Sequence, residues 1–226
     1  MHVDDEDSLH SNCIISIFQG HTDYPLTASG IDGAQRLGDA FRTIKWDFIV
    51  CSDLPRTQKT LALIEKQRVQ PLIDIQVMVT SIVREVHFGI REGLHKDLTV
   101  EDAKRILCEQ TGKSEDSIVD SAESEEQVFA RQIEFINQLR SRLSDLVNIT
   151  EEPVKVLCVS HGGFIRRFLS NFSKEKVEAI PNCSITNLHL TYAQDDSFPA
   201  CRVMHVCEST HLTGDDKTVE EYIWPN

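Results

Sequence analysis

The sequence lacks any apolar run of the roughly 18 residues that are needed to cross a bilayer. It also lacks a basic start, because Asp4, Asp5, Glu6 and Asp7 dominate the first residues. A secretory signal instead opens with positive charge and continues with an apolar stretch. Both absences argue against membrane insertion and against secretion. We therefore expect a cytoplasmic protein without a membrane partner.

Basic residues are scarce: 23 lysines and arginines stand against 36 aspartates and glutamates, which gives a net charge of −13. Such a charge repels the phosphate backbone of nucleic acids, so we expect no nucleic-acid partner. The same charge repels phosphorylated small molecules at long range. A phosphate site in this chain therefore has to be a local basic pocket.

The cysteines do not suit a disulfide framework. Their number, seven, is odd, and most lie inside apolar runs, which is typical of small core residues in a reducing compartment. One group raises an alternative, because Cys201, His205 and Cys207 fall on one face of a predicted strand, as metal ligands would. No fourth ligand is apparent, and a buried strand explains the spacing better, so we expect no metal site.

The length of 226 residues suits one well-buried domain. Residues 1–11 are acidic and carry no apolar pattern, so we expect a disordered tail and then a single domain over 12–226. Runs with strand character alternate with runs of helical spacing, which predicts an α/β fold: a three-layer α/β/α sandwich with a mostly parallel central sheet. Strands are predicted at 13–18, 46–52, 74–79, 154–160, 184–192 and 200–208, and helices at 27–41, 55–66, after Thr99, at 124–147 and at 164–172.

The clearest helix is the one at 124–147. Ser124 and Gln127 match a capping box at its start. Apolar residues then recur at helical spacing, and we interpret them as one stripe of core packing. The stripe consists of Phe129, Ile133, Ile136, Leu139, Leu143 and Leu146.

One residue with candidate chemistry directly follows the strand at 154–160. This residue, His161, precedes Gly162, where a helix is predicted to begin. Open parallel sheets bind ligands at the carboxyl ends of their strands, and a helix N-terminus offers unpaired N–H groups to an anion. His161 is therefore a candidate contact to a phosphoryl group, and the alternative is that it only caps the helix.

Two further candidates follow other strands. Arg56 lies in the first turn of the helix after the strand at 46–52, where its planar fork suits bidentate phosphate binding. Glu85 lies in a loop that carries two glycines, where a carboxyl group beside phosphate could donate a proton to a leaving oxygen. For each residue alone the alternative is a solvated side chain on the surface.

Five segments in order carry a resemblance to a known family. They are QGHTDYPLTASG, CSDLPRT, REVHFGIREG, VSHGGFIRR and PNCSIT, between Gln19 and Thr186. Together they resemble the histidine phosphatase superfamily, whose fold is that of the phosphoglycerate mutases. The HFGIREG segment and the long insert before the helix at 124–147 are most similar to the fructose-2,6-bisphosphatase TIGAR group.

The resemblance implies a phosphatase that passes a phosphoryl group through a phosphohistidine, with no metal or organic cofactor. Its substrates would be small phosphate esters such as sugar or glycerate phosphates. Arg56 would hold the phosphoryl oxygens, His161 would stabilise the charge that grows in transfer, and Glu85 would be the general acid. The other positions that match substrate-binding positions of the family are Gln19, Gly20 and Gly162.

The sequence departs from the family at its start. The family opens with a strand that ends in Arg-His-Gly-Glu, whose histidine is the nucleophile, and this tetrapeptide does not occur here. The spacing places it at 5–8, which reads DEDS, so we expect the first strand to be absent or replaced and the chain to be nearly inactive. A rival alignment treats Gln19–His21 as a degraded copy and puts His21 near the nucleophile's place.

Several questions stay open at this level. The run at 13–18 could move into the vacant strand position, the chain could fold poorly, or a longer protein could begin upstream of Met1, which we favour. The competing function is a non-catalytic protein on the same fold that binds phosphorylated ligands or partners. His87 and His95 either line a pocket or lie on the surface. The substrate determinants are expected at 94–123, and the oligomeric state is not predicted.

Overall fold

The computed structural model describes residues 17–69, 75–149, 152–192 and 199–213. The predicted tail at 1–11 and most of the predicted strand at 13–18 lie outside these residues. The helices are α2 (Ala28–Ala40), α3 (Pro55–Lys66), α4 (Val100–Thr111), α5 (Glu125–Ile149) and α6 (Gly162–Phe172). The strands are β1 (Phe48–Ser52), β2 (Gln76–Thr80), β3 (Val156–Val159), β4 (Ile185–Thr191) and β5 (Ala200–Glu208).

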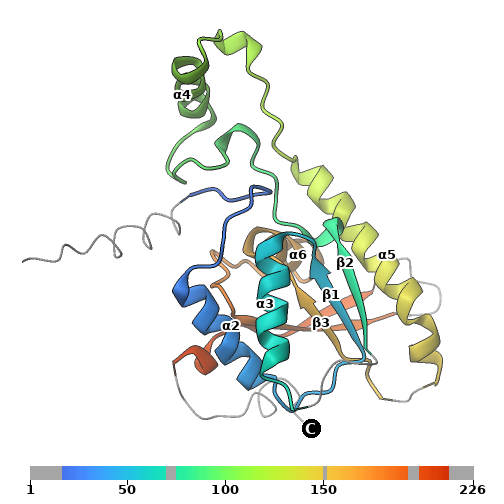
Figure 1. Ribbon diagram of the computed structural model, residues 1–226. Coiled ribbons are helices and arrows are strands. Elements are labelled where there is room, and N and C mark those ends of the chain that lie inside the picture. The colour runs from blue at the N-terminus through green and yellow to red at the C-terminus, as the bar shows by residue number, and fades with distance from the viewer. Residues whose placement is uncertain (1–16, 70–74, 150–151, 193–198, 214–226) are drawn as a thin grey trace, which may run out of the picture.

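Three parallel strands form the central sheet, in the order β2-β1-β3 (Figure 1). The middle strand, β1, is buried at every residue, as its unbroken apolar run predicts. Because the strands are parallel, Ser52, Thr80 and Val159 end at the same edge of the sheet. This carboxyl edge is where the sequence predicts a ligand site.

Helices cover both faces of the sheet, which confirms the predicted three layers. On one face, α2 and α3 pack against Ile49 and Cys51 of β1 through a core cluster that also includes Leu157 of β3. On the other face, α5 and α6 pack against Phe48 and Val50. The alternation of these side chains along β1 follows from the two-residue period of a strand.

Local signals in the sequence set the helix starts correctly. Thr27 accepts a hydrogen bond from the N–H of Gly30 at 3.1 Å, and Pro55 occupies the first position of α3. Thr99 and Asp102 form a complete capping box at the start of α4. These caps satisfy backbone groups that would otherwise be left unpaired.

The predicted core stripe of α5 is partly wrong. Phe129 is 43% exposed and stacks on Phe172, with ring centroids 5.8 Å apart. The face that enters the core instead includes Val128, Gln132 and Phe135, all buried. Gln132 is tolerated there because its amide is paired, donating to the carbonyl of Phe164 and accepting from Asn171.

The outer side of β3 is open among the described residues. There β3 pairs only with β1, while β4 and β5 form a separate antiparallel pair. Cys51 is buried and the half-buried Cys183 and Cys201 pack against the core clusters, so the prediction of core cysteines holds for these three, whereas Cys158 is exposed although it lies inside β3. Ile17 and Phe18 bridge to the segment at 92–95 and do not join the sheet.

Cys158, on this side of β3, combines an exposed position with a raised thiol pKa. Desolvation by the protein packed around it raises the pKa of its thiol to about 12, although by surface area the residue is exposed, and the exposure decides whether a reagent reaches it. Because the thiolate is the nucleophile, we expect alkylation by iodoacetamide in the native protein to accelerate about tenfold per pH unit over the alkaline range. Peptide mapping by mass spectrometry measures the rate. Buried Cys51 is the internal control, and equal labelling of both would contradict the open edge.

Candidate functional site

The three predicted side chains meet at the carboxyl edge of the sheet. Arg56 starts from α3 after β1, Glu85 follows β2 and a short 3-10 turn, and His161 follows β3. The three residues are far apart in the sequence. Each follows a strand of the parallel sheet, so all three loops lie at the same edge.

His161 occupies the N-cap position of α6, but its side chain accepts no bond from the helix. Its Nε2 lies 2.9 Å from the hydroxyl oxygen of Ser52, and the residue is only 8% exposed. Burial lowers the pKa of His161 to about 2, and the positive charge of Arg56 adds to this. The imidazole is therefore neutral near pH 7, and its role is not that of a side-chain helix cap.

Glu85 is bound to the start of the same helix. Its two carboxylate oxygens accept from the N–H groups of Gly163 at 3.0 Å and Phe164 at 3.1 Å, and one of them also accepts from Val86 at 2.8 Å. Negative charge is favoured at this end of a helix. Three of the roughly four lone-pair sites of the carboxylate are used in this way, and Oε2, which accepts one bond, keeps a site that could carry a proton.

Arg56 is held by the loop that the sequence predicts to approach substrate. Its two terminal nitrogens donate to the carbonyls of Gly20 at 2.7 Å and Thr22 at 3.0 Å. Burial lowers the pKa of Arg56, whereas the nearby carboxylate of Glu85 raises it. Since a guanidinium carries five N–H donors, three remain for a ligand.

The glycines of the predicted site differ in what they do. Gly20 adopts a φ of +55°, and a side chain there would collide with the carboxylate of Glu92. Gly162 instead packs tightly beside Ile180 at the start of α6. Gln19 accepts, through its backbone carbonyl, a hydrogen bond from the N–H of Thr22 that closes the turn.

Sequence reasoning missed two ion pairs that support this edge. Arg84 donates both Nε and a terminal nitrogen to Asp53, at 2.6 and 2.7 Å, and so links the end of β1 to the segment that carries Glu85. Arg131 of α5 pairs with Glu123 in the same two-bonded way. In the sequence, the signal for this role of Arg131 was its position as a polar residue on the inward-facing side of the helical pattern.

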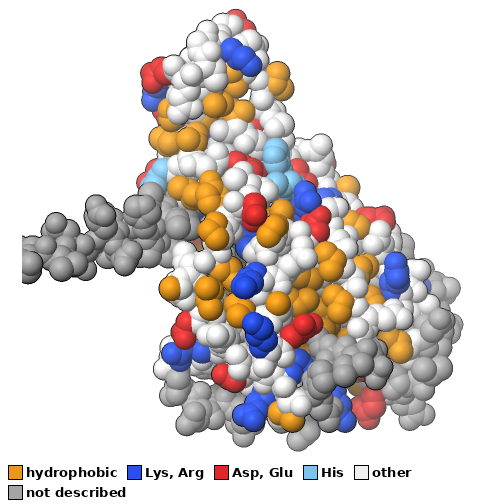
Figure 2. All heavy atoms as spheres, viewed as in Figure 1, with side chains coloured by type: hydrophobic (Ala, Val, Ile, Leu, Met, Phe, Trp, Pro, Cys, Tyr) orange, Lys and Arg blue, Asp and Glu red, His pale blue; other side chains and the backbone are white. Residues whose placement is uncertain are grey.

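Histidines gather where the arm that carries α4 meets the rest of the molecule (Figure 2). Nε2 of His21 donates to the carbonyl of Glu85 at 2.8 Å, and the ring lies 4.9 Å from the ring of His87. His95, in contrast, is half exposed and lies 3.3 Å from Asp97. His21 and His87 thus border the site, while His95 lies on the surface.

Among residues 17–69, 75–149, 152–192 and 199–213, no three His, Cys, Asp or Glu side chains are grouped to hold a metal ion. In the same residues, no helix is long and apolar enough to span a bilayer.

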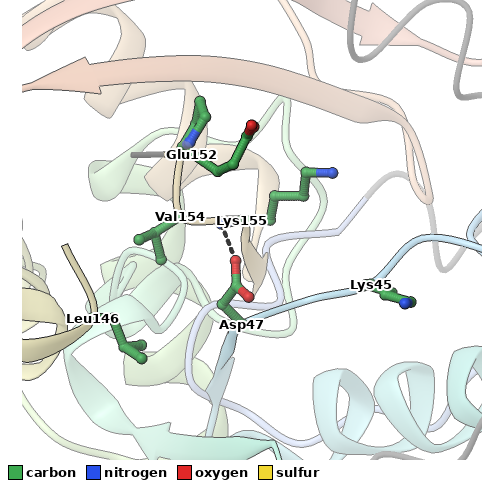
Figure 3. A pocket seen from close by; sticks show the side chains of 7 residues that line it. Lys45, Asp47, Leu146, Glu152, Val154 and Lys155 are labelled. Atoms are coloured by element: carbon green, nitrogen blue, oxygen red, sulfur yellow. Dashed lines mark hydrogen bonds between the residues drawn. The ribbon is translucent and has the colours of Figure 1, made fainter. Parts of the chain in front are cut away.

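A hollow of about 300 Å³ lies at the opposite, amino end of the sheet. It is lined by Lys45, Asp47, Leu146, Glu152, Pro153, Val154 and Lys155. Asp47 accepts from the backbone N–H of Lys155 at 2.7 Å, and the ammonium groups of the two lysines do not converge (Figure 3). The titratable cluster at the carboxyl edge is therefore the better candidate site.

The buried neutral histidine makes stability depend on pH. Because the pKa of His161 is about 2 in the folded state and 6.5 in its ordinary environment, the unfolded state binds the extra proton. Stability is therefore full above about pH 6.5 and falls on acidification, by up to about 1.4 kcal/mol per pH unit.

Urea unfolding at pH 7.5 and at pH 5 tests this expectation, since carboxylates contribute little in that interval. We expect the parent to lose about 2 kcal/mol and His161→Gln to lose distinctly less. The lowered pKa values of His21 and His211 leave the variant a smaller slope of the same sign. Identical losses in both proteins would contradict a buried neutral imidazole.

Comparisons with known proteins show the family to which the chain belongs. A model of the histidine phosphatase superfamily (branch 1) matches residues 13–197. The adenosylcobalamin/α-ribazole phosphatase of Escherichia coli is 29% identical over 168 residues, covering 74% of this chain and 76% of that protein. A broad-specificity phosphatase of Saccharomyces cerevisiae is 29% identical over 177 residues, covering 75% and 70%.

Solved structures share the fold. A mycobacterial glucosyl-3-phosphoglycerate phosphatase superposes with a TM-score of 0.68 at 22% identity, covering 87% of this chain and 92% of that one. A phosphoglycerate mutase from Bacillus anthracis gives 0.66 at 20% identity, covering 88% and 89%. Since the family model spans well over half of the sequence, this chain belongs to the histidine phosphatase superfamily.

Proposed function

We propose that this chain binds small phosphate monoesters at the carboxyl edge of its sheet. The observation that carries the proposal is that Arg56, Glu85 and His161 follow the strands of one parallel sheet at its carboxyl edge, where the charge of Arg56 acts on His161 and that of Glu85 acts on Arg56. The protein as a whole is acidic, with a net charge of −13, so phosphate binding at this edge would depend on the guanidinium of Arg56, with the neutral imidazole of His161 as a further donor.

Each residue has a distinct proposed role. The free N–H groups of Arg56 bind the non-bridging phosphoryl oxygens, and the imidazole of His161 donates a further hydrogen bond. The turn at 19–22 borders the ligand from the other side, and Gly162 lets the start of α6 approach it. Glu85, protonated on Oε2, supplies the proton to the leaving oxygen.

The substrate class follows from resemblance. Relatives include phosphatases named for α-ribazole and for broad specificity, together with phosphoglycerate mutases. Sequence similarity to the fructose-2,6-bisphosphatase TIGAR group adds sugar bisphosphates. We propose a sugar or glycerate phosphate, handled in the cytoplasm, with slow hydrolysis because the Arg-His-Gly-Glu nucleophile is missing.

A second candidate function is phosphate binding without turnover. One observation favours it: the carboxylate of Glu85 accepts three backbone N–H bonds, two of them at the start of α6, and these favour its ionised form over the acid that would donate a proton. Turnover of an aryl phosphate separates the two candidates. Activity that His161→Ala abolishes supports the enzyme, whereas binding of phosphate with no turnover supports the binding protein.

Isothermal titration with inorganic vanadate, a phosphate mimic, tests the binding proposal. Arg56→Ala is expected to weaken binding about 10- to 100-fold, because a charge-assisted hydrogen bond contributes about 1.5–3 kcal/mol. Arg36→Ala is the matched control, since Arg36 lies on α2 in an exposed pair with Asp32. Equal affinity of the parent and Arg56→Ala would overturn the proposed site.

A further inference from the structure

One carboxylate organises the loop at the proposed site. Glu92, whose side chain is 10% exposed, accepts from the backbone N–H groups of His21 and Thr22, each at 2.9 Å. It also accepts from the hydroxyl of Thr22 at 2.6 Å and from the N–H of Phe88 at 3.1 Å. Four donors thus converge on one side chain that the family resemblance did not single out.

The same loop is held from its other side by the site itself. The carbonyls of Gly20 and Thr22 accept from the two terminal nitrogens of Arg56. The ring of His21, between them, reaches the carbonyl of Glu85. The N–H groups of the loop therefore face a carboxylate while its carbonyl groups face the guanidinium, so the loop connects the two charged groups.

We propose that Glu92 is a positioning residue, which sets the affinity of Arg56 for a phosphoryl group by holding the loop at 20–22. This inference rests on the proposed phosphate site. With the loop fixed, two N–H groups of Arg56 donate to the carbonyls of Gly20 and Thr22. The orientation of the remaining three N–H groups is then set before a ligand binds. Pre-ordering of this kind reduces the entropy that binding would otherwise cost.

The chemistry of glutamate at this position is specific. Every one of the four partners is a donor, so an ionised carboxylate satisfies all of them. A glutamine would turn an NH₂ group towards at least one donor, and an aspartate is one methylene shorter. Burial by itself would raise the pKa of Glu92, but the hydrogen bonds that it accepts outweigh burial, and its pKa is lowered.

The fit of Gly20 is independent support for a fixed loop. Its positive φ and its contact with Glu92 leave no room for a side chain. Glu92 and Gly20 therefore form a matched pair, in which the missing side chain of one makes space for the carboxylate of the other. A loop that merely crossed the surface would not require this match.

Vanadate titration of a double-mutant cycle tests the proposal. Glu92→Gln is expected to weaken binding about tenfold in the parent, and to change it less than twofold when Arg56 is already lysine. Lysine keeps the positive charge but cannot hold both carbonyls at once. Thr22→Val removes only the hydroxyl contact and should give a smaller loss, so the cycle has a second variant if Glu92→Gln folds poorly.

Glu208→Gln is the matched control. Glu208 also accepts a backbone N–H, from Thr210 at 2.7 Å, but it lies on β5 outside the cluster, so vanadate affinity should stay the same. If Glu92→Gln weakens vanadate binding by the same factor in the parent and in Arg56→Lys, its role is merely structural and the proposal is overturned. Loss on Arg56→Ala but none on Glu92→Gln would overturn it while the proposed function stands; a parent that binds no vanadate overturns both.

Discussion

A protein of these 226 residues is expected to hydrolyse an aryl phosphate on the order of 10⁴ to 10⁶ times more slowly than a family member with its nucleophile. The reason is chemical: the family transfers the phosphoryl group to the histidine of Arg-His-Gly-Glu, and that tetrapeptide is missing here. What remains, Arg56 and His161, can bind and stabilise charge but does not replace a covalent step.

Steady-state turnover of p-nitrophenyl phosphate, measured beside the related yeast phosphatase, provides the comparison. His21→Asn is the informative variant, because His21 borders the site and a rival alignment puts it near the nucleophile's place. We expect this variant to lower the residual rate by about tenfold or less, because one hydrogen bond between the loop and Glu85 is lost while no covalent step depends on the ring. Turnover within about 100-fold of the yeast enzyme would refute the expectation, and its abolition by His21→Asn would support the rival alignment.

The largest loss of stability is expected from Arg131→Met. The guanidinium pairs with Glu123 at 2.7 and 2.8 Å and donates to the carbonyls of Ile82 and Arg84 at 2.6 and 3.2 Å. It also lies 5.2 Å from the ring centre of Phe164. Removing it leaves the largely buried carboxylate of Glu123 without its counter-charge, with only the backbone N–H of His87 still bound, and it removes the donor to both carbonyls, which costs about 3–5 kcal/mol.

Urea unfolding measures this loss of stability. The same substitution should also change the geometry of the site. The carbonyls that accept from Arg131 belong to the segment that leads into Glu85, so vanadate affinity should fall even where the variant is fully folded. Arg36→Met is the control, because its exposed pair with Asp32 within one helix contributes about 0.5 kcal/mol or less. A loss for Arg131→Met no larger than for Arg36→Met would show that this clamp does not hold the edge.

The sequence was sufficient for much of the central architecture. A continuous apolar run such as the one that forms β1 is stable when both of its faces are buried, as they are in the middle of a parallel sheet. Because parallel strands share a carboxyl edge, the residues that follow β1 and β3 could be expected to meet, and Arg56 and His161 do. Local capping signals at Thr27 and Thr99 likewise needed no knowledge of distant contacts.

Other features depend on contacts that a linear pattern does not contain. Phe129 matches a helical stripe, but the phase of α5 against the sheet buries Val128 in its place. Glu92 is ordinary in sequence and gains its importance only when His21 and Thr22, about 70 positions away, fold onto it. The exposure of Cys158 reflects the open side of β3, which no local pattern predicts.

A crystal structure of the protein soaked with vanadate would be the most direct measurement. The account predicts one anion in hydrogen-bond contact with the guanidinium of Arg56, close to His161 and to the turn at 19–22. An anion bound instead in the hollow beside Lys45 and Lys155, at the other end of the sheet, with the carboxyl edge left empty, would contradict it.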